Sequence, residues 1–162
     1  MLGPYSSSIT EAVADVSEKH KMPMVAPSAG ATSIYRKGRK FIFQVLSPAE
    51  IYLEGLLDLA AKKGLKTVAL INADELAVRA IAQGALELAK KKGLRVLFVD
   101  AYPLGNTDFS AILTKVRAAN PDVLAGATRF EDAVAITHQM KALNVNPRMV
   151  GLTIGVDLPP RP

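Results

Sequence analysis

Cysteine and tryptophan are absent from this 162-residue chain, and only two histidines occur. Without cysteine the chain has no disulfide, no thiolate nucleophile and no zinc–sulfur centre. His20 and His138 each fall late in an expected helix with no second ligand at metal-binding spacing, which favours surface or helix-end roles. No apolar run is long enough to span a membrane, although 49% hydrophobic residues suffice for a folded core.

Aromatic residues are also scarce, at 6% of the chain, and they do not alternate with basic residues. The net charge of +5 comes from cations that are mostly dispersed or precede a glycine at an expected helix end. This pattern argues against nucleic-acid binding. The chain also lacks the G-x-G-x-x-G and P-loop motifs and the G-x-S-x-G nucleophile elbow. The sequence therefore predicts no cofactor, no metal and no catalysis.

The apolar residues that are present alternate between helical and strand-like spacing, which predicts an α/β fold. Strands are expected at 22–26, 41–46, 67–71, 96–99, 122–127 and 149–152, and helices beginning near Ser8, Ser47, Asn72, Thr107 and Thr128. From residue 47 onward the connections are short, which predicts a Rossmann-like parallel sheet with helices on both faces. In such sheets ligands bind beyond the carboxyl ends of the strands.

Hydroxyl groups gather at two expected helix or turn starts. Ser6, Ser7 and Ser8 open the first helix, and a second hydroxyl- and glycine-rich turn spans residues 28–33. Hydroxyls beside free backbone N–H groups can bind a carboxylate or another anion. Ser8 and Glu11 also fit a capping box, so simple helix capping is the alternative reading.

Charged residues at the later helix starts mostly suit the helix dipole, as Asp74-Glu75 and Glu131-Asp132 do. Arg129 does not, because it follows a strand and opens a helix, where a cation is unfavourable. A charge placed this way indicates a ligand or an ion-pair partner.

Taken together, the sequence resembles the solute-binding proteins of branched-chain amino acid ABC transporters, the leucine/isoleucine/valine-binding group. The resemblance rests on four segments in order: GPYSSSIT at 3–10, PMVAPSAGAT at 23–32, DFSAILTKVRAANPDVL at 108–124 and FEDAVAITHQMKAL at 130–143. It implies a periplasmic-binding fold of type I, with two Rossmann-like lobes around a ligand cleft. It further implies an extracytoplasmic receptor that works with the membrane permease of an ABC importer.

The resemblance also assigns candidate ligand-binding residues. Ser7 matches the serine that binds the ligand carboxylate, and the next turn contributes Ser28 with either Gly30 or Thr32. Arg129, with Phe130 beside it, stands where the family has an aromatic residue, and Thr153 stands near the family's acidic residue. Glu75 lies where the family often has a Tyr-Gly pair and is a candidate to line the cleft.

Two of these positions bear on the ligand. An α-ammonium group needs a carboxylate partner, which Thr153 cannot supply, whereas Arg129 suits a second carboxylate. The hypothesis is therefore a small organic acid, aromatic acids included, rather than leucine. An effector-binding regulatory domain or a cytosolic α/β enzyme on a similar sheet is the alternative; an upstream helix-turn-helix would favour the regulator, and an upstream signal peptide the receptor.

The resemblance divides the chain into a partial first lobe at residues 1–46, the second lobe at 47–155 and a truncated tail at 156–162. No signal peptide is visible, and the family's first two βα units and C-terminal stretch have no counterpart, so we expect an internal piece of a longer protein. Residues 1–46 should lack a core of their own and expose Ile9, Val13 and Val16. We expect them to pack on a second copy of the chain or on the remainder of a cleaved parent, and the piece alone to bind ligand poorly. A monomer in sedimentation that binds ligand tightly would contradict this.

Overall fold

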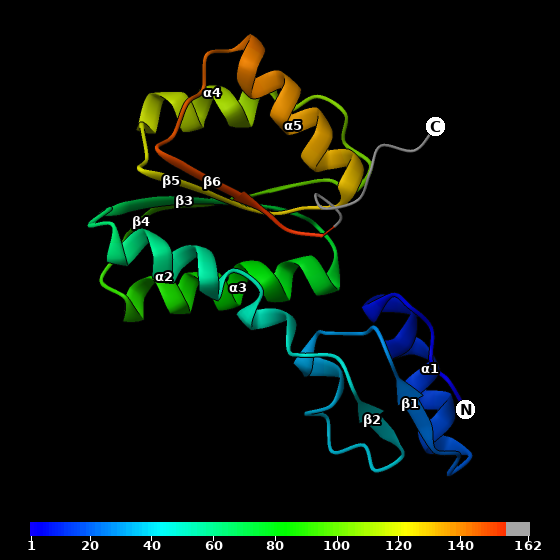
Figure 1. Ribbon diagram of the computed structural model, residues 1–162. Coiled ribbons are helices and arrows are strands. Elements are labelled where there is room, and N and C mark those ends of the chain that lie inside the picture. Colours follow the sequence, from blue (N-terminus) through cyan, green and yellow to red (C-terminus); the bar gives the residue numbers. More distant parts are fainter. Residues whose placement is uncertain (155–162) are drawn as a thin grey trace.

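The computed structural model describes residues 1–154. Its larger part, residues 47–154, holds a four-stranded parallel sheet in the order β4-β3-β5-β6. The strands are β3 (Thr67–Ala73), β4 (Arg95–Tyr102), β5 (Val123–Ala127) and β6 (Met149–Leu152), and the helices are α2 (Glu54–Lys62), α3 (Leu76–Lys91), α4 (Ser110–Ala119) and α5 (Phe130–Ala142). Figure 1 shows α2 and α3 on one face and α4 and α5 on the other, which confirms the predicted architecture.

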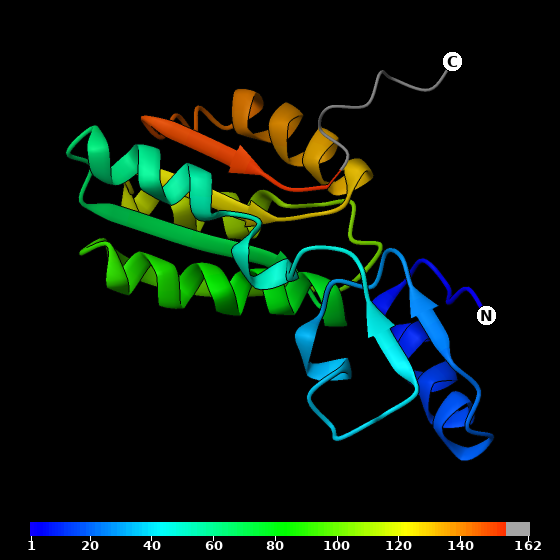
Figure 2. The same ribbon diagram turned by 60° about the horizontal axis from the view of Figure 1, so that its bottom comes forward.

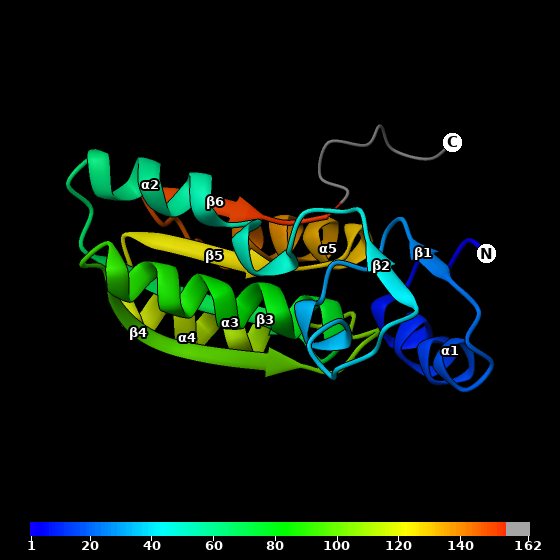
Figure 3. The ribbon, with the colours of Figure 1, turned by 90° about the horizontal axis from the view of Figure 1, so that it is seen from below.

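The smaller part, residues 1–46, lies at the end of that sheet toward which the strands point (Figures 2 and 3). It contains α1 (Ser7–Lys19), β1 (Met24–Ala26), the short 3₁₀ turn η1 (Thr32–Ile34) and β2 (Ile42–Gln44), with β1 and β2 paired in parallel. It does have a small core, contrary to expectation. Seven buried apolar residues form it: Ala14, Met24, Ala26, Ala29, Ala31, Ile34 and Ile42.

The central strands of the larger sheet follow directly from their composition. All residues of β5, and all of β3 except Thr67, are buried, because helices cover both faces of the sheet. β3 runs two residues further than predicted, since Asn72 and Ala73 continue the ladder opposite Ala101 and Tyr102 of β4. Asn72 is therefore a strand residue and not a helix cap, and Glu75 occupies the position before α3.

The predicted helix at Ser47 does not begin there. A 3₁₀ turn, η2 (Ala49–Ile51), comes first, and α2 starts only at Glu54. The turn packs directly against α3, where Gly84 leaves room for the backbone of Glu50. The Ala49 N–H also donates to the Gly30 carbonyl at 2.9 Å. These tertiary contacts hold residues 49–51 as a separate turn.

Three other helix starts also differ from prediction. The residue before α1 is Ser6 and not Ser8, and α4 begins after Phe109 rather than at Thr107. α5 is preceded by Arg129, not Thr128. The Thr128 hydroxyl instead donates to the Thr153 carbonyl at 2.8 Å, so the group expected to cap the helix joins the ends of β5 and β6.

α1 buries a different face from the one that its apolar pattern predicts. Its buried residues are Ser7, Thr10, Ala14 and Ser17. Ile9 and Val16 are instead 56% and 55% exposed, as expected for side chains without neighbours. The expectation is wrong for Val13, which is partly buried and packs against the small core. Further large apolar residues are exposed on residues 1–46: Leu2, Tyr5, Met22, Phe43, Val45 and Leu46. The proposed packing on a second copy stays a prediction.

In the larger part, too, the buried faces of two helices differ from those predicted. α5 buries Ile136, whereas Val134 and Thr137, which the pattern predicts to be inward, are exposed. α3 buries Val78 and Ala82, which the predicted stripe leaves out, while four residues of that stripe are only partly buried: Leu76, Ala77, Ala80 and Leu88. Each helix nevertheless keeps one face against the sheet, which is what positions the helix starts near one another.

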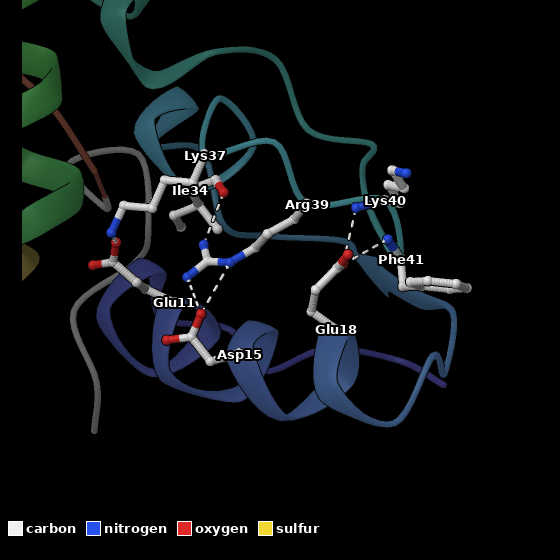
Figure 4. Close-up of polar contacts among 8 residues, drawn as sticks. All are labelled: Glu11, Asp15, Glu18, Ile34, Lys37, Arg39, Lys40 and Phe41. Carbon is white, nitrogen blue, oxygen red and sulfur yellow. Dashed lines mark hydrogen bonds and ion pairs between the residues drawn. The ribbon is translucent and has the colours of Figure 1, made fainter.

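Ion pairs and hydrogen bonds hold the segment after η1 against α1 (Figure 4). Three carboxylates of α1 accept these bonds: Glu11, Asp15 and Glu18. Arg39 is the most enclosed cation; its Nε donates to Asp15 at 3.2 Å and its Nη1 to the Ile34 carbonyl at 2.9 Å. Lys37 pairs with Glu11, and Glu18 receives the backbone N–H groups of Lys40 and Phe41. This network holds the loop without a large apolar core.

Within residues 1–154, none of the helices combines the length and the hydrophobicity needed to cross a bilayer. The predicted tail at 156–162 lies outside the described residues.

Candidate ligand site between the two parts

A cavity of about 270 Å³ lies where the two parts of the chain meet. Both parts line it, with residues from the start of α1, the loop after β1, the η2 region, α3 and the end of β5. The lining residues are Tyr5, Ser6, Ser7, Ser28, Gly30, Leu46, Ala49, Tyr52, Ala77, Ile81, Arg129 and Ile154. Of the eight residues predicted from sequence, Ser7, Ser28, Gly30 and Arg129 are among them.

The amino end of α1 forms one wall of the cavity. Ser6 precedes the helix and makes no side-chain capping bond, and the first intrahelical bond runs from the Thr10 N–H to the Ser6 carbonyl at 2.8 Å. The N–H groups of Ser7, Ser8 and Ile9 therefore lack an intrahelical acceptor. The positive end of the helix and these donors together favour an anion.

Ser7 is buried and oriented by its neighbours. Its Oγ accepts a hydrogen bond from the Ala31 N–H at 3.4 Å. Among the described residues no acceptor is paired with its hydroxyl proton, so that proton is free to be donated into the cavity. The predicted capping pair of Ser8 and Glu11 does not form, because Glu11 binds Lys37 instead.

The structure separates the two alternatives for the turn after β1. Gly30 lies on the cavity, and a Cβ there would approach both the Ala49 Cβ and the Tyr52 hydroxyl to 3.2 Å. Thr32 lies elsewhere: its N–H and hydroxyl both donate to Glu50 Oε1, at 3.2 and 2.5 Å. Glycine at position 30 therefore lets Ala49 and Tyr52 approach closely beside the cavity, whereas Thr32 holds η1 to η2.

Arg129 finds the ion-pair partner that its position indicates. Its Nε donates to Glu75 Oε2 at 2.9 Å, and its Nη2 pairs with the same oxygen. Burial by itself would lower the pKa of Arg129, but the hydrogen bond and charge of Glu75, together with smaller contributions from Tyr5 and Asp132, raise that pKa above its ordinary value. Arg129 lines the cavity and Glu75 does not. The carboxylate of Glu75 therefore pairs with the guanidinium from outside the cavity.

The backbone of Arg129 is fixed as well. Its N–H donates to Asp132 Oδ2 at 3.1 Å, which is the acidic half of a capping box at the start of α5. The same Asp132 oxygen accepts from the Tyr102 hydroxyl at 3.0 Å. A cation before this helix is unfavourable, but Asp132 supplies the negative charge that the positive end of the helix dipole favours. Asp132 therefore offsets the unfavourable position of Arg129.

Four predicted site residues lie away from the cavity. Besides Thr32 and Glu75, these are Phe130 and Thr153. Phe130 is half-buried in the first turn of α5. Thr153 is buried, and its Oγ1 accepts from the Thr128 N–H at 3.2 Å. This bond joins the ends of β5 and β6.

Two tyrosines on the cavity are missed by the sequence interpretation. Tyr5 precedes the serine run directly, and its position in that segment is the signal that could have found it. Tyr52 was expected to be buried on a helix face, but it follows η2 and reaches the cavity. Burial raises the pKa of the Tyr52 hydroxyl, with smaller contributions from Tyr5 and Glu50. The Tyr52 hydroxyl is therefore a neutral hydrogen-bonding group near pH 7.

The cavity is polar at the α1 end, apolar along Leu46, Ala49, Ala77 and Ile81, and cationic at Arg129. None of its described lining residues is an aspartate or a glutamate. Among residues 1–154 there is also no cluster of three or more histidines and carboxylates that could hold a metal ion. The arrangement suits non-covalent binding of a small anion with an apolar body.

Comparison with known proteins identifies relatives of this chain. A family model described as periplasmic binding protein matches residues 1–160. A Leu/Ile/Val-binding protein of Rhizobium johnstonii is 24% identical over 156 residues, covering 93% of this chain and 41% of that protein. The chain thus spans less than half the length of this relative.

Two solved structures share the fold. A solute-binding protein of an ABC transporter from R. palustris, in complex with benzoate, has a TM-score of 0.80 at 18% identity and covers 94% of this chain and 42% of its own. A leucine-binding protein of Thermotoga maritima has a TM-score of 0.79 at 23% identity, covering 88% and 41%. The chain belongs to the periplasmic binding protein family.

Proposed function

We propose that this chain forms the ligand-binding region of an extracytoplasmic solute receptor that delivers a small carboxylate to an ABC importer and catalyses no reaction. Membership of the periplasmic binding protein family supports the receptor role. The observation that carries the ligand class is the uncapped start of α1, where Ser6 and Ser7 face a cavity shared by both parts of the chain. The open amino end of the helix and the free hydroxyl proton of Ser7 suit a carboxylate.

The ligand on this proposal is an organic acid rather than an aliphatic amino acid. An α-ammonium group would need a carboxylate, and the described cavity lining offers none. It would instead share the cavity with the Arg129 cation. Leu46, Ile81 and the two tyrosines provide apolar surface for a ring. The R. palustris relative in complex with benzoate is consistent with an aromatic acid.

Binding would be coupled to movement of the two parts. The cavity lies between them, so a ligand that contacts Ser7 and Arg129 together stabilises the closed arrangement by differential contact. The connection is short, and the bond from Ala49 to Gly30 lies beside it. We propose that the permease recognises this closed arrangement.

Isothermal titration calorimetry with a panel of acids tests the proposed function. We expect at least one aromatic or aliphatic organic acid to bind, with leucine, isoleucine and valine binding more weakly. Selective binding of the branched-chain amino acids would contradict the ligand class. Binding by none of the acids or amino acids would contradict the receptor role of this cavity.

Replacing Ser7 with alanine is expected to weaken carboxylate binding about 10- to 150-fold, because a hydrogen bond to a charged group contributes roughly 1.5–3 kcal/mol. Ser8→Ala is the matched control, since Ser8 is exposed on the same turn and does not line the cavity. Calorimetry on both variants provides the measurement. Equal affinity of the Ser7 and Ser8 variants would show that Ser7 serves only to position residue 31.

A further inference from the structure

The ion pair between Glu75 and Arg129 joins two elements that are 54 residues apart in sequence. The side chain of Glu75 is 8% exposed and that of Arg129 is 24% exposed. Glu75 stands at the start of α3 and Arg129 at the start of α5, on the side of the sheet that faces the cavity. The only charged group on the described cavity lining is therefore already neutralised by a carboxylate behind it.

The pair as a whole carries no net charge, although Arg129 itself stays protonated and keeps hydrogen-bond donors. Nε and Nη2 both point to Glu75 Oε2, while Nη1 has no partner among residues 1–154. A guanidinium carries five N–H groups, so several remain for a ligand. A neutral acceptor, such as an amide or a hydroxyl oxygen, can use these donors at no electrostatic cost.

A second carboxylate on the ligand would bind less favourably beside Arg129 than a neutral acceptor. It would lose its hydration and stand beside Glu75, which already shares the guanidinium charge. In a partly buried site the repulsion between two carboxylates is screened only weakly. The first carboxylate does not face this penalty, because it binds at the α1 end among serine hydroxyls and helix N–H groups.

We propose that Glu75, a residue outside the cavity, determines the charge of the ligand: the site accepts a monocarboxylate whose far end is uncharged and polar, and it discriminates against the corresponding dicarboxylate. This rests on the proposed function, since it concerns the same cavity. It replaces the sequence-based hypothesis that Arg129 awaits a second carboxylate. Glu75 is on this view a positioning residue that acts through Arg129.

The test compares two ligands of the same shape, terephthalate and its monoamide 4-carbamoylbenzoate, which differ by one negative charge. By calorimetry at pH 7, the unaltered protein should bind the monoamide about 10-fold or more tightly than terephthalate. Glu75→Gln keeps a hydrogen-bond acceptor for Arg129 but removes the charge. This variant should shift the ratio of the two affinities about 10-fold or more toward terephthalate.

Two controls separate this effect from a general loss of negative charge. Glu131→Gln removes one exposed carboxylate from the first turn of α5, outside the cavity lining, and should leave the ratio unchanged. The double variant Glu75→Gln/Arg129→Gln should lose the gain for terephthalate. Because the unaltered protein already gives a ratio, the inference can be tested even where Glu75→Gln does not fold.

Preference of the unaltered protein for terephthalate, or an unchanged ratio in a folded Glu75→Gln variant, would overturn the inference and leave the proposed function intact. Failure of these and all other carboxylates to bind would overturn the proposed function, and this inference with it. Added salt should reduce the gain for terephthalate in Glu75→Gln more than it reduces binding of the monoamide, since the gain is electrostatic.

Discussion

Alanine at Gly84 is expected to lower the free energy of unfolding by about 2–4 kcal/mol, and the melting temperature by roughly 5–15 °C. A Cβ at this position would lie 2.0 Å from the Glu50 carbonyl oxygen and 2.5 Å from its Cα. Both are backbone atoms, so no side-chain rotation can relieve the overlap. The greater helix propensity of alanine, up to about 1 kcal/mol, is too small to compensate.

The matched control is Gly55→Ala in α2. Gly55 is also helical, but a Cβ there would meet no atom within 4 Å. This variant should be as stable as the unaltered protein, or more stable by up to about 1 kcal/mol. Thermal unfolding followed by circular dichroism measures both. Equal melting temperatures for the two variants would contradict the close packing of η2 on α3.

The same contact bears on ligand binding. η2 carries Ala49 and leads into Tyr52, and both residues line the cavity. Displacement of η2 away from α3 would move these two residues relative to Ile81, which stays on α3. A folded Gly84→Ala variant should therefore also bind its ligand more weakly than Gly55→Ala does.

Methionine at Arg129 is expected to destabilise the fold by about 2–4 kcal/mol, because it leaves the enclosed carboxylate of Glu75 without its cation. The double variant Glu75→Leu/Arg129→Met should recover most of that loss, since replacing both partners of a buried pair by apolar residues is often neutral. Urea unfolding at pH 7 measures all three proteins. The comparison separates the penalty of an unpaired charge from the loss of side-chain packing.

An exposed pair nearby provides the control. Arg79 pairs with Asp74 at 2.7 Å, and both side chains are more than half exposed. Arg79→Met should change the free energy of unfolding by less than about 1 kcal/mol. If Arg129→Met were as mild as Arg79→Met, the Glu75–Arg129 pair would be no more than a surface contact, and its proposed influence on ligand charge would lose its basis.

Much of the larger part follows from local sequence. The uninterrupted apolar runs of β3 and β5 predict strands covered on both faces, and the structure places them at the centre of the sheet. The glycines at 64 and 93 follow α2 and α3 with positive φ, as a helix-ending glycine does. These features depend on neighbours in the chain, so the sequence alone suffices to predict them.

The candidate site was only partly predictable. Ser7, Ser28, Gly30 and Arg129 stand at the ends of strands or the starts of helices, and such positions converge in a parallel sheet. Tyr52 was not recognised because its spacing matches a buried helix face, whereas the contact of η2 with α3 interrupts that helix. Thr153 was predicted to line the cavity, but its hydroxyl instead accepts a hydrogen bond from the Thr128 N–H.

The sequence by itself determined the order of helices and strands, the parallel sheet and the hydroxyl-rich start of α1, because periodicity and capping preferences act over a few residues. The tertiary structure decided which face α1 buries, that residues 49–51 form a separate turn, and that Arg129 is neutralised by Glu75. Each of these depends on groups that are distant in sequence, and a pairing across 54 residues leaves no local pattern. The contacts across the fold therefore set the charge of the cavity, and with it the ligand that the cavity can hold.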